Sequence, residues 1–517
     1  MTVETGAMAL EESAQRRQSR VALEHALAVI ERWALAITAV VVFASVVLLA
    51  AVHVADRYLV NQVSGAWMTL ARSVHHGMLY PPLHQAGRTF GTLYMPLPFV
   101  AHGGVSLITG EYLVSGKVTA YATALLLFSL LFVLLRQVGS STVVAAALVA
   151  AVVVVPAGYL ATLSIRGDAL SVVFQLAALL VIWRSQSRRA IYGSSVLCAL
   201  AVASKATALW APLAIAIWLF SRDRRSAGRF TLGFVAVTAV TIATLVSISG
   251  GYLIDDLVTL TFSNSTAAHS TPLSGASTFV HLAVLKGDAP WLLFGCAIAA
   301  AISSLRRREL SLFQLSLAIS LLIAVVVLRD PGADYNHLLD FSVLTALVVG
   351  EFWARPRRTD GSPDLVAVVL TLAVVVGVAL GYTNTIKPDI GLAARLATGH
   401  GSDNRYSTNP LRGLIRPHDR VLSEDPTISI LSGRIPVTDP LTLPRLGKAH
   451  PAWITELQRE IERHYFDEIV LIRPVDPNAF HATQSFGKVV TRAIATNYRF
   501  ETVVPTGSLS YYVYVPK

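Results

Sequence analysis

Several charged residues of this chain lie where long apolar stretches begin or end. Asp56 follows the first such stretch, Asp168 opens another, and Lys205 lies between two apolar runs. Charges at the edge of an apolar environment are costly and are candidates for function. A carboxylate can take a proton from a hydroxyl group, and cations such as Arg166 and Lys205 can bind a phosphate. The residue types therefore suit proton transfer beside a bound anion.

Each of these residues also has a purely structural interpretation. Asp56 could form an exposed ion pair with Arg57. Asp168 could be stabilised by the positive N-terminal end of its helix and by Arg166. Lys205 could extend its ammonium group toward the lipid headgroups. The sequence alone leaves these alternatives open.

Further polar residues lie in the same regions. Asn336 and His337 begin an apolar stretch and are flanked by Asp334 and Asp340. Four loop residues could line a substrate groove: Tyr80, Arg88, Tyr94 and Glu111.

No metal site is predicted. The adjacent residues His75 and His76 lie on a predicted helix, where neighbours in sequence point apart. Asp255 and Asp256 could bind a divalent ion or cap the helix that follows, and a cap is the simpler interpretation. The chain's two cysteines, Cys198 and Cys296, fall inside apolar stretches and indicate neither a disulfide framework nor a zinc site.

The elements that must position these residues are long apolar segments. A helix needs about 20 apolar residues to cross the hydrocarbon core of a bilayer. Eleven stretches approach that length: 33–55, 114–136, 142–161, 167–184, 190–203, 205–220, 229–249, 289–305, 310–328, 336–353 and 363–384. The fold class predicted is a polytopic α-helical membrane protein with about eleven transmembrane helices.

Composition supports a membrane protein. The hydrophobic fraction is 54% and charged residues make up 14%, with a mean hydropathy of +0.57. These values lie outside those of soluble globular domains. The net charge of +10 does not indicate a nucleic-acid partner, because the arginines cluster beside the ends of apolar stretches. No cleavable signal peptide is expected, because the first 20 residues lack an apolar core.

The arginines predict the orientation, since basic residues in short loops favour the cytoplasm. The clusters that fall on one face are Arg16/Arg17/Arg20/Arg32, Arg136, Arg184/Arg188/Arg189, Arg222/Arg224/Arg225/Arg229, Arg306/Arg307/Arg308 and Arg355/Arg357/Arg358. We therefore expect a multi-pass protein of the plasma membrane, with a cytoplasmic N-terminal arm (1–32), a transmembrane domain (33–384) and an extracytoplasmic C-terminal domain (385–517). Outer loops are predicted at 56–113 and 250–288.

The first outer loop is predicted to contain two helices that do not cross the membrane. Residues 61–77 have helical apolar spacing and suit a helix that lies on the outer leaflet. Residues 96–109 are apolar but too short to cross, so a re-entrant or juxtamembrane helix is expected. Prolines at 81, 82, 96 and 98 restrict the chain between and at the start of these helices.

Hydropathy falls after residue 384, and loop residues dominate to about 417. The remainder alternates short strands with helices, which predicts a small α/β domain. Strands are predicted at 420–422, 434–437, 468–472, 499–503 and 509–515, and helices at 451–464 and 487–497. No phosphate-binding or nucleophile motif occurs in this region, so a lid or an acceptor-docking module is expected.

The order of motifs resembles the GT-C superfamily of integral-membrane glycosyltransferases, particularly the dolichyl-phosphate-mannose-protein mannosyltransferases and the bacterial group related to them. The matching residues in the first outer loop are Ala71, Gly77, Tyr80, Pro82, Tyr94, Pro96, Leu97, Gly110 and Glu111. Later segments that resemble the family are Ser164–Asp168, Ser204–Thr207 and Tyr335–Leu339. Family members usually have an acidic pair after the first span, whereas this chain has only Asp56, followed by Arg57.

The resemblance implies transfer of a sugar from a polyprenyl-phosphate carrier to a glycan, lipid or protein acceptor of the cell envelope. It implies catalytic roles for Asp56 and Asp168, with Arg166, Lys205, Asn336 and His337 near the donor. Two other functions are considered. A transporter or flippase of lipid-linked glycans would usually show internal repeats, which are not evident. A catalytically inactive GT-C-like protein of envelope assembly is the other alternative.

Overall fold

The structure is a computed structural model that describes residues 2–85, 87–262, 271–285, 290–307, 310–330, 333–354, 365–398, 419–439, 442–475, 486–506 and 509–517. The arginine cluster predicted at 355–358, Arg308 and most of the predicted linker at 399–418 lie outside these residues.

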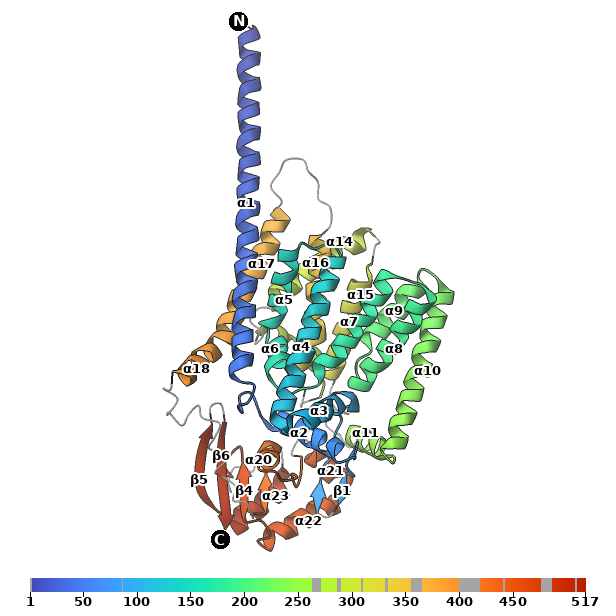
Figure 1. Cartoon of the computed structure of the whole chain (residues 1–517), viewed down its shortest axis with the longest axis vertical. Coiled ribbons are helices and arrows are strands. Elements are labelled where there is room, and N and C mark those ends of the chain that lie inside the picture. Colours follow the sequence, from blue (N-terminus) through green and yellow to red (C-terminus); the bar gives the residue numbers. More distant parts are fainter. Residues whose placement is uncertain are drawn as a thin grey trace.

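Long apolar helices form a bundle that makes up most of the molecule (Figure 1). Helix α1 (Thr2–Val52) is continuous, so the predicted arm and the first predicted span belong to one helix. The other bundle helices are α4 (Tyr112–Gln137), α5 (Thr142–Val153), α6 (Pro156–Leu163), α7 (Asp168–Arg184), α8 (Arg188–Ser204), α9 (Trp210–Phe220), α10 (Arg224–Ile248), α14 (Pro290–Arg307), α15 (Leu312–Val327), α16 (Leu339–Trp353) and α17 (Leu365–Gly381).

Within the described ranges, each of the eleven predicted stretches contains a helix. Four helical segments are long and apolar enough to cross a membrane: His25–Val52, Tyr112–Gln137, Arg224–Ile248 and Val366–Arg395. Helices α5 and α6 together form a fifth candidate that bends by 83°. The bend precedes Pro156, where proline disfavours a continuous helix. The total of eleven spans stays a prediction.

An outer layer of short elements covers one end of the bundle (Figure 1). It contains α2 (Gln62–His75), α3 (Pro96–Thr109) and α11 (Tyr252–Phe262). Helix α13 (Pro272–Val280) and the π-helical turn η1 (His281–Leu285) pack against the bundle. The two helices predicted in the first loop are present, and their position on the outer leaflet stays a prediction. The sequence did not predict the small hairpin of β1 (His84–Gln85) and β2 (Arg88–Thr89).

The C-terminal region folds around a four-stranded sheet in the order β3-β4-β6-β5. Its strands are β3 (Val421–Ser423), β4 (Glu468–Leu471), β5 (Tyr498–Thr506) and β6 (Leu509–Pro516), with β3 parallel to β4 and β6 antiparallel to both neighbours. Its helices are α20 (Pro426–Leu431), α21 (Leu443–Ala449), α22 (Pro451–Glu462) and α23 (Gly487–Asn497). Four of the five predicted strands and both predicted helices are present, whereas α20 and α21 were not predicted.

Two predictions for this region are wrong. Residues 434–437 do not form a strand, because the chain there leaves the sheet and runs past the hairpin, where Thr438 makes an isolated bridge with Thr89. Residues 387–397, predicted as loop, form α18 (Lys387–Ala397), which follows α17 through the π-helical turn η3 (Tyr382–Ile386).

The α/β region docks directly onto the outer layer. The Thr427 hydroxyl donates to the backbone carbonyl of Asn61 at 2.8 Å, and the Arg72 guanidinium donates to the Gly433 carbonyl at 2.8 Å. Gly65 permits this approach, because a Cβ atom there would overlap the Thr427 backbone. Helix α2 therefore lies between the bundle and α20, and it closes one side of the space described next.

Candidate active site

A cavity of about 650 Å³ lies where the bundle, the outer layer and the α/β region meet. Four groups of residues line it. The outer layer contributes Gln62, Val63, Trp67 and Thr92–Met95; the α6–α7 and α8–α9 turns contribute Arg166–Asp168 and Ser204–Thr207; α15 and the turn after it contribute Val326, Val327, Arg329, Asp330, Ala333, Asp334, Asn336 and His337; and the α/β region contributes Asp439, Thr442 and Arg445.

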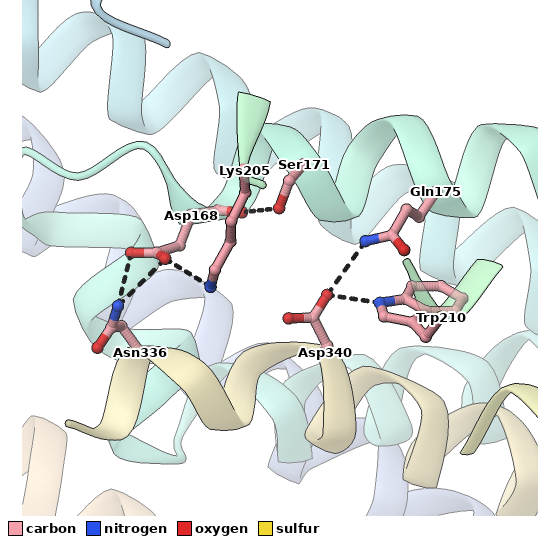
Figure 2. Close-up of polar contacts among 7 residues, drawn as sticks. All are labelled: Asp168, Ser171, Gln175, Lys205, Trp210, Asn336 and Asp340. Atoms are coloured by element: carbon pink, nitrogen blue, oxygen red, sulfur yellow. Dashed lines mark hydrogen bonds and ion pairs between the residues drawn. The ribbon is translucent and has the colours of Figure 1, made fainter. Parts of the chain in front are cut away.

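Asp168 is the centre of a polar network on the bundle side of this cavity (Figure 2). Its Oδ1 atom accepts a hydrogen bond from the Lys205 ammonium at 2.8 Å. The Asn336 amide donates to both carboxylate oxygens, each at 3.1 Å. The side chains of Asp168 and Lys205 are 15% and 16% exposed, so the ion pair is largely shielded from water yet still reaches the cavity.

Helix ends bring these three side chains together. Asp168 occupies the first turn of α7, where a carboxylate is favoured by the helix dipole. Lys205 is the C-terminal cap residue of α8, and Asn336 lies in the 3₁₀ turn η2 (Tyr335–Leu338), whose N-terminus is capped by Asp334. Because all three helices end at the same end of the bundle, their terminal residues converge.

Arg166 supplies a cation to the cavity wall. It lines the cavity two residues before Asp168, its side chain is half-buried, and no described residue accepts a hydrogen bond from its buried Nε atom. A buried N–H that lacks a partner is costly, and a guanidinium suits a bound anion. His337 lines the same cavity beside Asn336. The arrangement places a guanidinium next to a carboxylate–ammonium pair.

A stacked aromatic pair forms part of the outer wall. The rings of Trp67 and Tyr94 are 4.4 Å apart and nearly parallel. The Tyr80 hydroxyl donates to the Tyr94 carbonyl at 2.8 Å, so Tyr80 supports the wall from behind and does not itself line the cavity. Burial raises the pKa of the Tyr94 hydroxyl well above its ordinary value, so this group stays neutral.

The α/β region closes the cavity through an ion pair. The Arg445 guanidinium donates to both carboxylate oxygens of Asp330, at 2.7 and 3.0 Å. The cavity wall is thus shared between the two parts of the chain. The site prediction did not include Asp439, Thr442 or Arg445, because nothing in a local pattern reveals which loop of the tail faces the bundle.

Asp340 is a second buried carboxylate that the site prediction did not include. Its Oδ1 atom accepts hydrogen bonds from the Trp210 indole at 2.7 Å and from the Gln175 amide at 3.4 Å. In Figure 2, Lys205 lies between Asp168 and Asp340. The sequence feature that could have predicted Asp340 is its position, because it is a carboxylate inside an apolar stretch, four residues after Asn336.

The structure places Asp56 away from the cavity. Its Oδ2 atom contacts the His53 imidazole at 2.5 Å and its Oδ1 atom accepts from the Tyr58 backbone N–H at 2.8 Å. Asp56 is not among the residues that line the cavity. These contacts, within six residues of the end of α1, hold the carboxylate among its neighbours in the chain.

Six of the predicted site residues line one cavity: Arg166, Asp168, Lys205, Asn336, His337 and Tyr94. Arg88 is exposed on the hairpin, and Glu111 is exposed at the N-terminal cap position of α4. Neither lines the cavity. In the part of the chain that the structure describes, no group of three or more His, Cys, Asp or Glu side chains is placed to hold a metal ion.

No protein-family model and no curated protein matches the sequence. Solved structures do match the fold. Similar to this chain is ArnT from Cupriavidus metallidurans bound to undecaprenyl phosphate, with a TM-score of 0.59 and 11% sequence identity over 92% of this chain and 97% of that chain. Similar too is the oligosaccharyltransferase AglB from Archaeoglobus fulgidus in complex with an inhibitory peptide and a dolichol-phosphate, with a TM-score of 0.53 and 12% identity over 91% and 74%. The chain therefore shares the fold of these two solved proteins, in line with the resemblance that its motifs show.

Proposed function

We propose that the protein is a glycosyltransferase that moves a sugar from a polyprenyl-phosphate carrier to an acceptor of the cell envelope, on the extracytoplasmic side of the plasma membrane. The observation that carries the proposal is the cavity in which Arg166 lies two residues from the Asp168–Lys205–Asn336 network. The fold adds support, since ArnT and AglB were solved with lipid phosphates bound.

In this proposal the donor phosphate binds at Arg166 and Lys205. The Arg166 guanidinium can bind two phosphate oxygens at once. The Lys205 ammonium has three N–H donors, so it can contact the phosphate while it keeps its bond to Asp168. Cations at this position stabilise the negative charge that develops on the phosphate as the sugar departs.

The chemical step requires a base. A bond forms between the acceptor's hydroxyl oxygen and the anomeric carbon, the bond from that carbon to the phosphate oxygen breaks, and the phosphate leaves with the bonding electrons. The hydroxyl proton passes to a carboxylate. The sequence offered Asp56 and Asp168 for this role, and we assign it to Asp168 because it lines the cavity. Once Lys205 is shared with the phosphate, Asp168 becomes a better proton acceptor.

A transfer assay with matched carboxylate variants tests the proposal. The protein in lipid nanodiscs is given a panel of radiolabelled polyprenyl-phosphate monosaccharides together with an envelope extract. Asp168→Asn is expected to lower kcat by about 10²- to 10⁴-fold, the usual effect of losing a general base. Asp56→Asn should stay near the parental rate, as should the control Glu111→Gln, whose side chain is exposed and off the cavity.

Two outcomes would contradict the proposal. A parent protein that transfers sugar from no donor of the panel would oppose the reaction class. An Asp56→Asn variant that loses transfer while Asp168→Asn retains it would move the base to the other carboxylate.

A further inference from the structure

Helix α11 carries a carboxyl group on the face where its neighbours are apolar. Leu253, Asp256 and Leu260 share the buried side of this helix, and Asp256 is fully buried. Leu253 packs with Tyr80, Trp67 and other residues of the outer layer, whereas Leu260 packs with Leu83 and Leu446. Asp256 therefore lies between two apolar clusters, where an apolar side chain would be expected.

Asp256 makes one specific contact. Its Oδ2 atom accepts a hydrogen bond from the Thr92 backbone N–H at 2.9 Å. Its Oδ1 atom is buried and, among the described residues, has no hydrogen-bond partner. No described cation forms an ion pair with it. A buried polar group with so little compensation is costly and calls for an explanation.

The hydrogen bond between Asp256 and Thr92 is the first of a series of hydrogen bonds that leads to the cavity wall. Thr92 Oγ1 accepts a hydrogen bond from the Tyr94 backbone N–H at 3.0 Å. The Tyr80 hydroxyl holds the Tyr94 carbonyl, and the Tyr94 ring stacks on Trp67. The four residues Thr92–Met95 all line the cavity. Both backbone polar groups of Tyr94 are thus fixed, one of them through Thr92.

We propose that Asp256 is a positioning residue that fixes the Thr92–Met95 wall of the cavity by accepting the Thr92 N–H. It does not touch the cavity itself, since it is not among the lining residues. Its effect on substrate rests on the proposed function, because the wall it holds carries Tyr94. Its effect on the backbone of Thr92 does not.

The surroundings make this support sensitive to pH. Burial raises the pKa of the Asp256 carboxyl from 3.8 to about 8. The hydrogen bond from the Thr92 N–H opposes this by favouring the charged form, and the nearby negative charge of Asp255 adds a smaller increase. Tyr80 is the other titratable group that interacts with it. An exposed aspartate ionises near pH 4, so opening of the wall releases a proton and is favoured increasingly as the pH rises from about 4 to about 8. Above about pH 8 the carboxyl is charged in the closed state as well, and the wall is then least stable.

Amide hydrogen exchange at Thr92 tests the inference without any assay of sugar transfer. Exchange is measured in nanodiscs and expressed as protection factors, which remove the intrinsic effect of pH. At pH 7, Asp256→Leu should lower the protection of Thr92 by about tenfold, the effect of losing one hydrogen bond. Asp256→Asn keeps a carbonyl acceptor and cannot ionise, so the protection of Thr92 should be at least that of the parent. The control Asp255→Asn changes the exposed neighbour and should match the parent.

A second comparison holds even if Asp256→Leu fails to fold. Between pH 7 and pH 9 the parent should lose protection at Thr92, while Asp256→Asn, which cannot ionise, should not. Where transfer is measurable, the KM for the acceptor should rise over the same range in the parent alone, with kcat less affected. Equal protection in the parent and Asp256→Asn at both pH values would overturn the inference, as would unchanged protection in a folded Asp256→Leu. Failure of all transfer assays would count against the proposed function alone.

Discussion

The turn from Ser164 to Asp168 carries both a phosphate-binding candidate and the assigned base, and one glycine determines how closely it approaches the outer layer. A Cβ atom on Gly167 would lie 2.6 Å from Pro98 Cβ and would overlap the Trp67 ring. The backbone of Gly167 is ordinary, with φ of −95°, so crowding and not backbone strain is the reason for glycine here. The glycine lets Trp67 pack against the turn.

We therefore expect Gly167→Ala to displace either Trp67 or the turn. Overpacking of this kind typically costs about 1–3 kcal/mol. Thermal unfolding should show a moderate loss of stability, and the transfer rate should fall by more than stability explains, because Arg166 and Asp168 move together. Gly104→Ala in α3 is the matched control, since its Cβ would meet nothing within 4 Å. Parental transfer by Gly167→Ala would show that the turn tolerates this displacement.

The sequence indicated much of the site because charged residues at helix ends are visible in a hydropathy pattern. Asp168, Lys205 and Asn336 lie at the ends of three apolar stretches on one predicted side, and the structure brings them into contact. Asp56 met the same criterion. It differs because a local bond to His53 fixes its direction, and hydropathy carries no information about such a contact.

Among the elements, the turn between α15 and η2 and the helix α21 meet across the cavity. Their contact is the ion pair of Arg445 with Asp330, whose side chains are 18% and 32% exposed. Partial shielding makes such a pair stronger than a surface pair. A single guanidinium nitrogen, Nη2, donates to both oxygens of Asp330. This ion pair connects the α/β region to the bundle side of the cavity.

Removing the Arg445–Asp330 ion pair should make the α/β region more mobile at the cavity. Arg445→Ala is expected to raise the KM for donor and to increase cleavage by protease near residues 439–445. The exchanged pair, Arg445→Asp with Asp330→Arg, should recover part of both properties. Arg420→Ala is a control, because the Arg420–Asp467 pair is exposed and lies within the α/β region. If Arg445→Ala behaves as the parent, the ion pair does not hold the α/β region over the cavity. The same conclusion follows if the exchanged pair recovers neither property.

The sequence predicted most helices and strands correctly, but it did not predict how the α/β region packs against the outer layer. Apolar length predicted the helices, and alternation predicted four of the strands of the α/β region. The segment 434–437 alternates like a strand, yet the chain there follows the hairpin and not the sheet. The contact of α20 with α2 depends on Gly65, whose role becomes visible only when both surfaces are known.

For the molecule as a whole, the central feature is a junction. The outer layer lies between the bundle and the α/β region (Figure 1). The cavity takes cations and a carboxylate from the bundle, an aromatic wall from the outer layer, and its remaining wall from the α/β region. A carrier lipid anchored in the membrane beside the bundle would present its phosphate at the depth where helix ends collect. The proposed reaction uses this placement of the phosphate beside Asp168.

The most direct test is an experimental structure of the protein in nanodiscs with undecaprenyl phosphate bound. We predict that the phosphate lies in the cavity, within hydrogen-bonding distance of the Arg166 guanidinium and beside Lys205. A phosphate bound elsewhere would contradict the account, most clearly one held near Asp56 and His53. A structure in which Arg166 contacts only protein groups while the lipid phosphate is bound would contradict it equally.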